Sequence, residues 1–120
     1  MKWYIDKDRP ICPQIEEQIC AWIALGYLSP GERLKSVRET AVDAGVNPNT
    51  VQKAYSELER DGMIFSRVGS GWYVSEETGL ASEKLEKLLN EKTSRFLNDM
   101  KVLGENGSRV IGRIKEMCDE

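Results

Sequence analysis

The segment 45–62, GVNPNTVQKAYSELERDG, constrains the fold of this chain more than any other stretch. Gly45 stands where a helix ends, because glycine takes the left-handed C′ conformation without strain. Asn47 and Pro48 open the next helix, since asparagine is a favoured N-cap and the fixed φ of proline suits the first helical turn. The segment therefore predicts a helix end, a tight turn and a new helix with an uncharged polar start.

The helix before this turn has a start signal of its own. Ser36 and Glu39 have the S-x-x-E spacing of a capping box, so we expect that helix over 37–44. The helix after the turn is expected over 48–61, with one apolar face at helical spacing. The residues of that face are Val51, Ala54, Tyr55 and Leu58. Together the two helices and their turn are typical of a helix-turn-helix, whose second helix enters the DNA major groove N-terminus first.

A glycine-rich hairpin follows the second helix. Gly62 ends that helix, 63–67 is a strand candidate, 68–71 turns the chain, and 72–74 returns as the partner strand. A hairpin directly after the second helix of such a motif is a wing. With an amphipathic helix over 14–25 ahead of the motif, the order of elements predicts a winged helix-turn-helix.

Short strands are also expected at Trp3–Ile5 and over 33–35. Past a polar break at 76–79, a long amphipathic helix is expected over 80–103, and a turn at 104–107 separates it from a second, shorter one. Two such helices cannot enclose a core alone, so their apolar faces must dock on the winged helix or on another subunit. Of these alternatives we favour a homodimer interface, made by Leu85, Leu89, Phe96, Met100, Leu103, Ile111 and Ile114.

The expected fold class is therefore mainly α with a small β-hairpin: a winged helix-turn-helix plus a C-terminal helical dimerisation arm. In domain terms, 1–75 forms the DNA-binding domain, 76–79 the linker and 80–120 the two-helix dimerisation region. We expect 1–75 alone to be monomeric and weak on DNA.

The composition limits the class of protein. The chain is 40% hydrophobic and 31% charged, which is globular composition. Its N-terminus is polar and charged, unlike a signal peptide, and its longest uncharged apolar run, 19–28, is shorter than the roughly 20 residues of a membrane span. We expect a cytoplasmic protein with no membrane partner.

The residues that carry most enzyme chemistry are scarce. The three cysteines, Cys12, Cys20 and Cys118, have no metal-binding spacing, and the chain has no histidine. We expect inert thiols, with a redox-sensing role as the alternative. No nucleophile–base pair, metal cluster or nucleotide loop stands out, so the expectation is a non-enzyme without metal or cofactor.

The net charge of −3 argues against DNA binding, but the local distribution favours it. Residues 30–75 contain six basic residues (Arg33, Lys35, Arg38, Lys53, Arg60, Arg67) and six acidic ones (Glu32, Glu39, Asp43, Glu57, Glu59, Asp61). Four of the cations fall near the expected groove-facing edges, whereas three of the carboxylates fall at the far end of the second helix. One subunit offers few phosphate contacts, so tight binding needs two.

Three linked motifs resemble the DNA-binding domain of the GntR family of bacterial transcription regulators: PGERLKSVRE (30–39), GVNPNTVQKAYSELERDGMI (45–64) and SRVGSGWYV (66–74). The short helical pair that follows is similar to the YtrA-type subfamily. The resemblance implies a sequence-specific, dimeric repressor of a transporter-type operon that binds an inverted-repeat operator in double-stranded DNA. Pro48 and Gln52 stand where many relatives carry arginine, so the operator should differ from theirs.

The resemblance also implies which residues contact DNA. Arg38 would contact a phosphate or a base edge, the start of the second helix would read bases, and the wing would approach the sugar-phosphate backbone. Asparagine and glutamine suit adenine, and lysine neutralises phosphate. The expected set is Lys35, Ser36, Arg38, Asn47, Pro48, Asn49, Thr50, Gln52, Lys53, Arg67, Gly69, Ser70 and Gly71.

Two questions stay open at this point. The neutral charge of 30–75 keeps a second function in view, a winged-helix protein–protein interaction module without specific DNA binding. A steep fall of DNA affinity with salt would separate the two. No sequence feature identifies a small-molecule effector, and Trp72 and Tyr73 are expected to be packing residues rather than platforms for bases.

Overall fold

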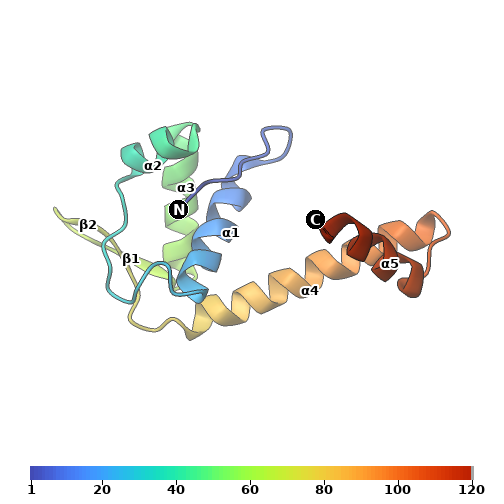
Figure 1. Cartoon of the computed structure of the whole chain (residues 1–120). Helices are drawn as coiled ribbons and strands as arrows, with labels where there is room; N and C mark the ends of the chain where they lie inside the picture. The colour runs from blue at the N-terminus through green and yellow to red at the C-terminus, as the bar shows by residue number, and fades with distance from the viewer. Residues whose placement is uncertain (120) are drawn as a thin grey trace. The chain divides into compact units, whose positions relative to one another are not determined.

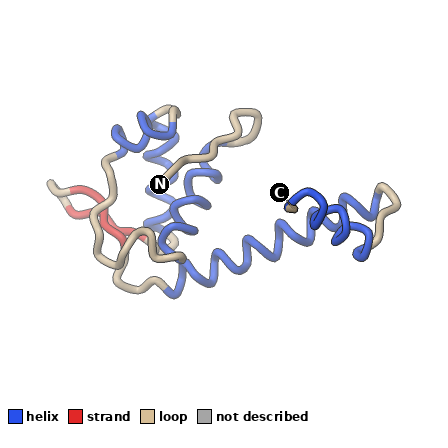
Figure 2. The backbone as a smooth tube through the Cα atoms, in the orientation of Figure 1, coloured by secondary structure: helices blue, strands red, loops and turns tan. Residues whose placement is uncertain are grey.

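The computed structural model describes residues 1–119 and is mainly helical, with one antiparallel hairpin (Figures 1 and 2). The chain divides into two compact units, Met1–Leu85 and the part from Glu86 onward. Its elements are α1 (Ile11–Ala24), α2 (Val37–Ala44), α3 (Pro48–Arg60), β1 (Ile64–Arg67), β2 (Gly71–Val74), α4 (Gly79–Val102) and α5 (Gly107–Cys118). The expected fold class is confirmed.

The turn between α2 and α3 forms as the sequence predicts. The capping box is complete, because the Ser36 side chain accepts from the backbone of Glu39 and the Glu39 carboxylate accepts from the backbone of Ser36. Those bonds to Ser36, the backbone N–H first, lower the pKa of Glu39. Gly45 ends α2 at φ 69°. Asn47 then caps α3 by accepting from the backbone N–H of Asn49 at 2.8 Å.

The hydrophobic core of the first unit lies where α1 and α3 pack together. The four expected apolar residues of α3 are all buried, and α1 contributes its own stripe. The large, fully buried side chains of this core include Ile15, Ile19, Val51, Tyr55, Leu58, Ile64 and Val74. The wing is therefore fixed to the helices through Ile64 and Val74, one residue from each strand.

The hairpin has a third, shorter partner. In the hairpin itself Ile64 pairs with Val74 and Arg67 with Gly71. The expected strand at 33–35 is instead a short segment over 32–34, which joins β2 through a single bridge between Arg33 and Tyr73.

The prediction of a strand at Trp3–Ile5 is wrong. That segment is extended, but its hydrogen-bond partners are side-chain amides on α1 rather than another strand. The amide of Gln18 accepts from the Tyr4 N–H at 2.9 Å and donates to the Tyr4 carbonyl at 2.7 Å. The buried Gln14 bonds the N–H and the carbonyl of Asp6 in the same way. The side chains of two glutamines therefore supply the backbone hydrogen bonds that a neighbouring strand would supply in a sheet.

α1 begins at Ile11, three residues before the expected start at Gln14. Pro13 lies in its first turn, where the missing N–H would have no helical partner in any case. The residue before the helix is Pro10, which offers no side-chain cap. The amide of Gln14 instead ties the preceding segment to the helix, because it donates to the carbonyls of Pro10 and Arg9.

The start of α4 belongs to the first unit. Ala81 is 1% exposed, and the buried thiol of Cys20 donates to its carbonyl at 3.4 Å. The compact unit accordingly ends at Leu85, ten residues beyond the domain range expected from the sequence. How much of the chain folds independently stays a prediction.

The second unit contains the rest of α4, a turn with Gly104 at φ 91°, and α5. The Glu105 carboxylate forms an ion pair with Arg109 at 3.3 Å and accepts from Arg113 at 3.4 Å, which fixes the turn to α5. Many of its large apolar side chains are exposed: Leu89, Phe96, Val102, Leu103, Ile111, Ile114 and Met117. Within residues 1–119, no helix combines the length and the apolar character that crossing a bilayer requires.

Candidate nucleic-acid interface

Tyr55 holds the helix-turn-helix together from α3. Its side chain is 1% exposed, and its hydroxyl donates to the Lys35 carbonyl at 2.8 Å. Because a tyrosine has one hydroxyl proton, the hydroxyl of Thr40 must donate to Tyr55 in their 2.8 Å contact. The ring meets Trp72 of the wing edge-on, with centroids 5.4 Å apart. One buried residue thus connects α3 to α2, to the segment before α2 and to the wing.

The same burial changes the chemistry of the Tyr55 hydroxyl. Removal from water, the largest cause, raises its pKa, so the group stays neutral and keeps its proton for the Lys35 carbonyl. Trp72 is half-buried against this ring, in agreement with the packing role expected for it.

The expected DNA-contacting residues are mostly accessible. Lys35, Ser36, Arg38, Asn47, Pro48, Asn49, Gln52, Lys53, Arg67 and Gly69 are exposed, and Thr50, Ser70 and Gly71 are half-buried. Two of the polar side chains already have partners. Asn47 uses its carbonyl oxygen to cap α3, and the Gln52 amide donates to the hydroxyl of Ser56 at 3.4 Å. Gln52 can exchange that long, exposed contact for a base edge, since it costs little to break.

The cations of 30–75 fall into two groups. Lys35 is 2.5 Å from the Asp43 carboxylate, and Arg60 pairs with Glu57. Within residues 1–119 the other four form no ion pair with a carboxylate: Arg33, Arg38, Lys53 and Arg67. The balanced total charge therefore conceals a set of cations that are free to neutralise phosphate.

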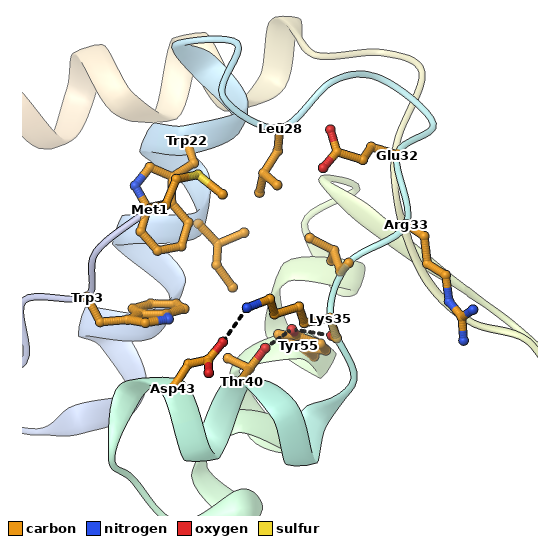
Figure 3. Close-up of a pocket in the computed structure, with 12 residues that line it drawn as sticks. Met1, Trp3, Trp22, Leu28, Glu32, Arg33, Lys35, Thr40, Asp43 and Tyr55 are labelled. Atoms are coloured by element: carbon orange, nitrogen blue, oxygen red, sulfur yellow. Dashed lines mark hydrogen bonds and ion pairs between the residues drawn. The ribbon is translucent and has the colours of Figure 1, made fainter.

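Lys35 differs from the other expected phosphate contacts. Figure 3 shows its ammonium group directed into a pocket of about 170 Å³, towards Asp43 and beside Trp3. The Asp43 bond, the larger cause, and the charge of that carboxylate raise the pKa of Lys35. Lys35 must leave this ion pair before it can contact DNA fully. The ring of Trp22 meets Trp3 edge-on at 4.5 Å in the wall of the pocket.

The wing has a preorganised arginine. The Arg67 guanidinium lies 4.9 Å from the ring centroid of Tyr73 and 5.4 Å from that of Phe65. These two rings stack 5.7 Å apart, which gives the arginine a flat support. The Tyr73 hydroxyl forms a short hydrogen bond with the Ser70 hydroxyl at the tip. The turn takes a positive φ at Gly69 and at Gly71, a conformation that favours glycine.

Sequence reasoning missed two residues that the fold brings to this surface. Lys7 donates to the carbonyl of Gly45 at 3.0 Å and so places a cation at the C-terminal end of α2. Arg33 donates to the carbonyl of Ser70 at 2.6 Å in the wing turn. Each residue is more than 35 positions from its partner, and no local pattern could have linked them.

The cysteines are ordinary thiols in different environments, one half-buried, one buried and one exposed. The Cys12 thiol donates to the Glu16 carboxylate at 3.4 Å, and burial, the larger effect, together with that bond raises its pKa to about 11. A thiol with that pKa is a poor nucleophile at neutral pH. Burial likewise raises the pKa of Cys20. Across residues 1–119, no cluster of cysteine and acidic side chains has the composition and spacing to hold a metal ion.

Comparison with known proteins agrees with this geometry. Residues 13–74 match the family "Bacterial regulatory proteins, gntR family". The chain is 39% identical to the uncharacterised HTH-type transcriptional regulator YhcF of Bacillus subtilis, over 92% of each chain. It is 38% identical to the HTH-type transcriptional repressor YtrA of the same organism, over 90% of this chain and 84% of that protein.

Two solved structures extend the comparison. A GntR family transcriptional regulator from Listeria monocytogenes superimposes with a TM-score of 0.77 at 36% identity, and covers 93% of this chain and 98% of that one. The DNA-binding domain of AraR, solved in complex with operator ORX1, has a TM-score of 0.53 at 25% identity and covers 62% of this chain and 92% of that one. From its winged helix, its motifs and these relatives, the chain belongs to the GntR family of bacterial regulatory proteins, as a DNA-binding transcription regulator of the YtrA type.

Proposed function

We propose that this regulator is a homodimeric repressor, without enzymatic activity, that binds an inverted-repeat operator. The observation that carries the proposal is the first turn of α3 and its surroundings. An exposed, uncharged polar start carries Asn49 and Gln52, and the exposed Lys53 follows directly. Base-reading side chains flanked by unpaired cations are what specific DNA binding needs.

Each side chain has a role that its chemistry suits. Asn49 and Gln52 can each bond one adenine through both a donor and an acceptor. Lys53 and Arg38 act on phosphate and add affinity for any sequence. Thr50 is half-buried beside them and can reach a phosphate or a thymine methyl group.

Two features of a single subunit support the dimer, its few unpaired cations and its exposed apolar side chains. One subunit presents four unpaired cations within 30–75, too few for the affinities of about 10⁻⁸ to 10⁻¹¹ M typical of operators. The second unit leaves Leu89 and Phe96 exposed on α4, and Leu103 exposed directly after its end, at seven-residue intervals. A two-fold dimer covers this surface, doubles the phosphate contacts, and sets two half-sites about one helical turn apart. The relative YtrA is named a repressor, which supports that direction of control.

Two substitutions on one helix test the assignment of roles. Gln52→Ala should cost roughly 1–3 kcal/mol on the cognate site and relax the preference at one base position. Lys53→Ala should weaken all sequences by a similar factor and leave the preference unchanged. The measurement is selection of bound duplexes from a random pool, followed by titration of selected and scrambled duplexes with the full-length protein.

Arg60→Ala is the matched control, because Arg60 lies on the same helix but is paired with Glu57. It should change neither the affinity nor the base preference. An unchanged preference for Gln52→Ala would remove that residue from the readout. A wild-type affinity for duplex DNA that does not fall with salt would contradict the proposed function itself.

A further inference from the structure

A short segment ahead of α2 extends the surface of the wing. The segment 32–34 runs along β2, where the Leu34 N–H donates to the Trp72 carbonyl and the Val74 N–H donates to the Glu32 carbonyl, both at 2.8 Å. Arg33 is thereby placed opposite Tyr73. The wing is a two-stranded sheet with Arg33 on a short segment bridged to its β2 edge.

The register places two arginines on one face of this surface. Side chains alternate between faces along a strand. Because Arg33 pairs with Tyr73 and Tyr73 with Phe65, these three share a face, and the next pair, Arg67 and Gly71, shares it too. The opposite face holds the buried side chains of Ile64, Val74 and Leu34. One side of the wing thus faces the core, and the other carries both guanidinium groups.

Gly71 lies between the two arginines, where Arg33 approaches it closely. A Cβ atom added at Gly71 would lie 3.2 Å from Nε and 3.3 Å from Nη2 of Arg33. From this position the Arg33 guanidinium donates to the Ser70 carbonyl at 2.6 Å. Figure 3 shows the Arg33 side chain directed away from the neighbouring pocket. Arg33 therefore lines the pocket only with the part of the residue near the backbone, and its guanidinium group belongs to the wing.

Neither arginine is neutralised by a carboxylate within residues 1–119. Carboxylates near these positions in the chain are engaged elsewhere. Glu32 accepts from the backbone N–H of Ser29, Glu39 completes the capping box, and Glu59 accepts from Ser66. The Ser70 bond uses one of the five N–H donors of Arg33, and four remain.

We propose that the outer face of the wing is a phosphate-binding surface for double-stranded DNA, in which Arg33 acts with Arg67. Arg33 has two tasks: it positions the wing turn through the Ser70 carbonyl, and it presents its remaining donors to the sugar-phosphate backbone. The planar guanidinium suits bidentate contact with phosphate. The backbones of the two arginines are two strands apart, about 10 Å at the usual strand spacing, and each guanidinium group is expected to make a phosphate contact of its own. The inference rests on the proposed DNA binding.

The test separates the two tasks of Arg33 in the full-length protein. Arg33→Gln keeps an amide donor for the Ser70 carbonyl and removes the charge. The slope of log affinity against log salt should fall by about 0.9 for each lost phosphate contact, hence by about 1.8 for a dimer. Hydroxyl-radical protection at the wing-contacted flanks should remain. Arg33→Ala should lower the slope equally and also weaken that flanking protection, because the wing turn loses its anchor.

Arg60→Ala removes the same charge from a paired arginine of the same unit and should leave the slope unchanged. A purely structural Arg33 would give Arg33→Gln the wild-type slope, and that result would overturn the inference. The Arg33→Gln measurement decides the question even if Arg33→Ala fails to fold. A wild-type protein that binds duplex DNA without salt dependence would instead remove the proposed function, so the two failures are distinguishable.

Discussion

The two units of this chain have similar apolar stripes on their helices, but the first unit buries its stripe and the second leaves much of its stripe exposed. In Met1–Leu85, the stripe of α3 is enclosed, and Val51, Ala54 and Tyr55 are each no more than 1% exposed. From Glu86 to residue 119, Val110 alone is buried, whereas Phe96 on α4 is 43% exposed. Burial of a side chain such as Phe96 is worth a few kcal/mol. The first unit therefore encloses a core of its own, and we expect the second to gain most of its stability from a partner that covers it.

Among the substitutions that test this difference between the units, Phe96→Asp should have the largest effect. A charge placed in the proposed interface between subunits has no partner there and must be desolvated, so the full-length protein should become monomeric at micromolar concentration. The thermal unfolding of the first unit should be unchanged. Sedimentation velocity together with circular dichroism measures both properties. Phe96→Ala should loosen the dimer without abolishing it.

Asn98→Asp is the control, since it adds the same charge to an exposed position on the same helix but away from the apolar stripe. It should leave the protein dimeric. If the protein with Phe96→Asp still sediments as a dimer, or if the wild-type protein is already monomeric, the second unit does not mediate association.

Tyr55→Phe tests how much one buried hydroxyl contributes to the stability of the first unit, and a smaller effect is expected. It removes the hydroxyl that bonds the Lys35 carbonyl and accepts from Thr40, so two polar groups lose a partner. The free energy of unfolding should fall by about 1–3 kcal/mol, with no change in oligomeric state. Urea denaturation measures the loss.

Tyr27→Phe is the matched substitution at a tyrosine that is 64% exposed, and it should be nearly neutral. Equal effects of the two substitutions would show that the buried hydroxyl contributes nothing beyond the packing of the ring.

The alkylation rates of the three cysteines test the difference between the two units without any substitution. Cys118, in the second unit, is exposed, while Cys20 is buried and Cys12 is half-buried in the first. At pH 7.5, iodoacetamide should modify Cys118 first and Cys12 slowly, because a pKa of about 11 leaves little Cys12 thiolate. The Cys12 rate should rise about tenfold per pH unit up to that pKa. Peptide mass spectrometry at timed intervals gives each rate, and an equal rate at Cys12 and Cys118 would contradict the assignment.

The sequence predicts the parts of the fold that local chemistry determines. The α2–α3 turn follows from Ser36, Gly45 and Asn47, whose capping and φ preferences act within a few residues. The buried face of α3 follows from helical periodicity in the same way. The same local reasoning was wrong for Trp3–Ile5, because the partner of that segment is the side chain of Gln18, which no strand pattern encodes.

Within the candidate site, the sequence could identify which residues are polar and exposed, but not their partners. The Lys35–Asp43 ion pair joins residues eight positions apart, and the Arg33 bond to Ser70 spans 37 positions. Both depend on the packed positions of α2 and the wing. The sequence alone treated Lys35 as one more phosphate contact and did not include Arg33 among the DNA-binding residues.

The separation of paired from unpaired cations has a consequence for how the regulator finds its site. The chain as a whole is negative, at −3, so its long-range field repels DNA of any sequence. We expect attraction only at short range, where the unpaired arginines and Lys53 would face the backbone, because physiological salt screens the rest within about 8 Å. Such a protein should spend little time on random DNA. We expect it to search the chromosome mainly by repeated short encounters through solution rather than by long sliding, with fewer of its copies sequestered on competing sites.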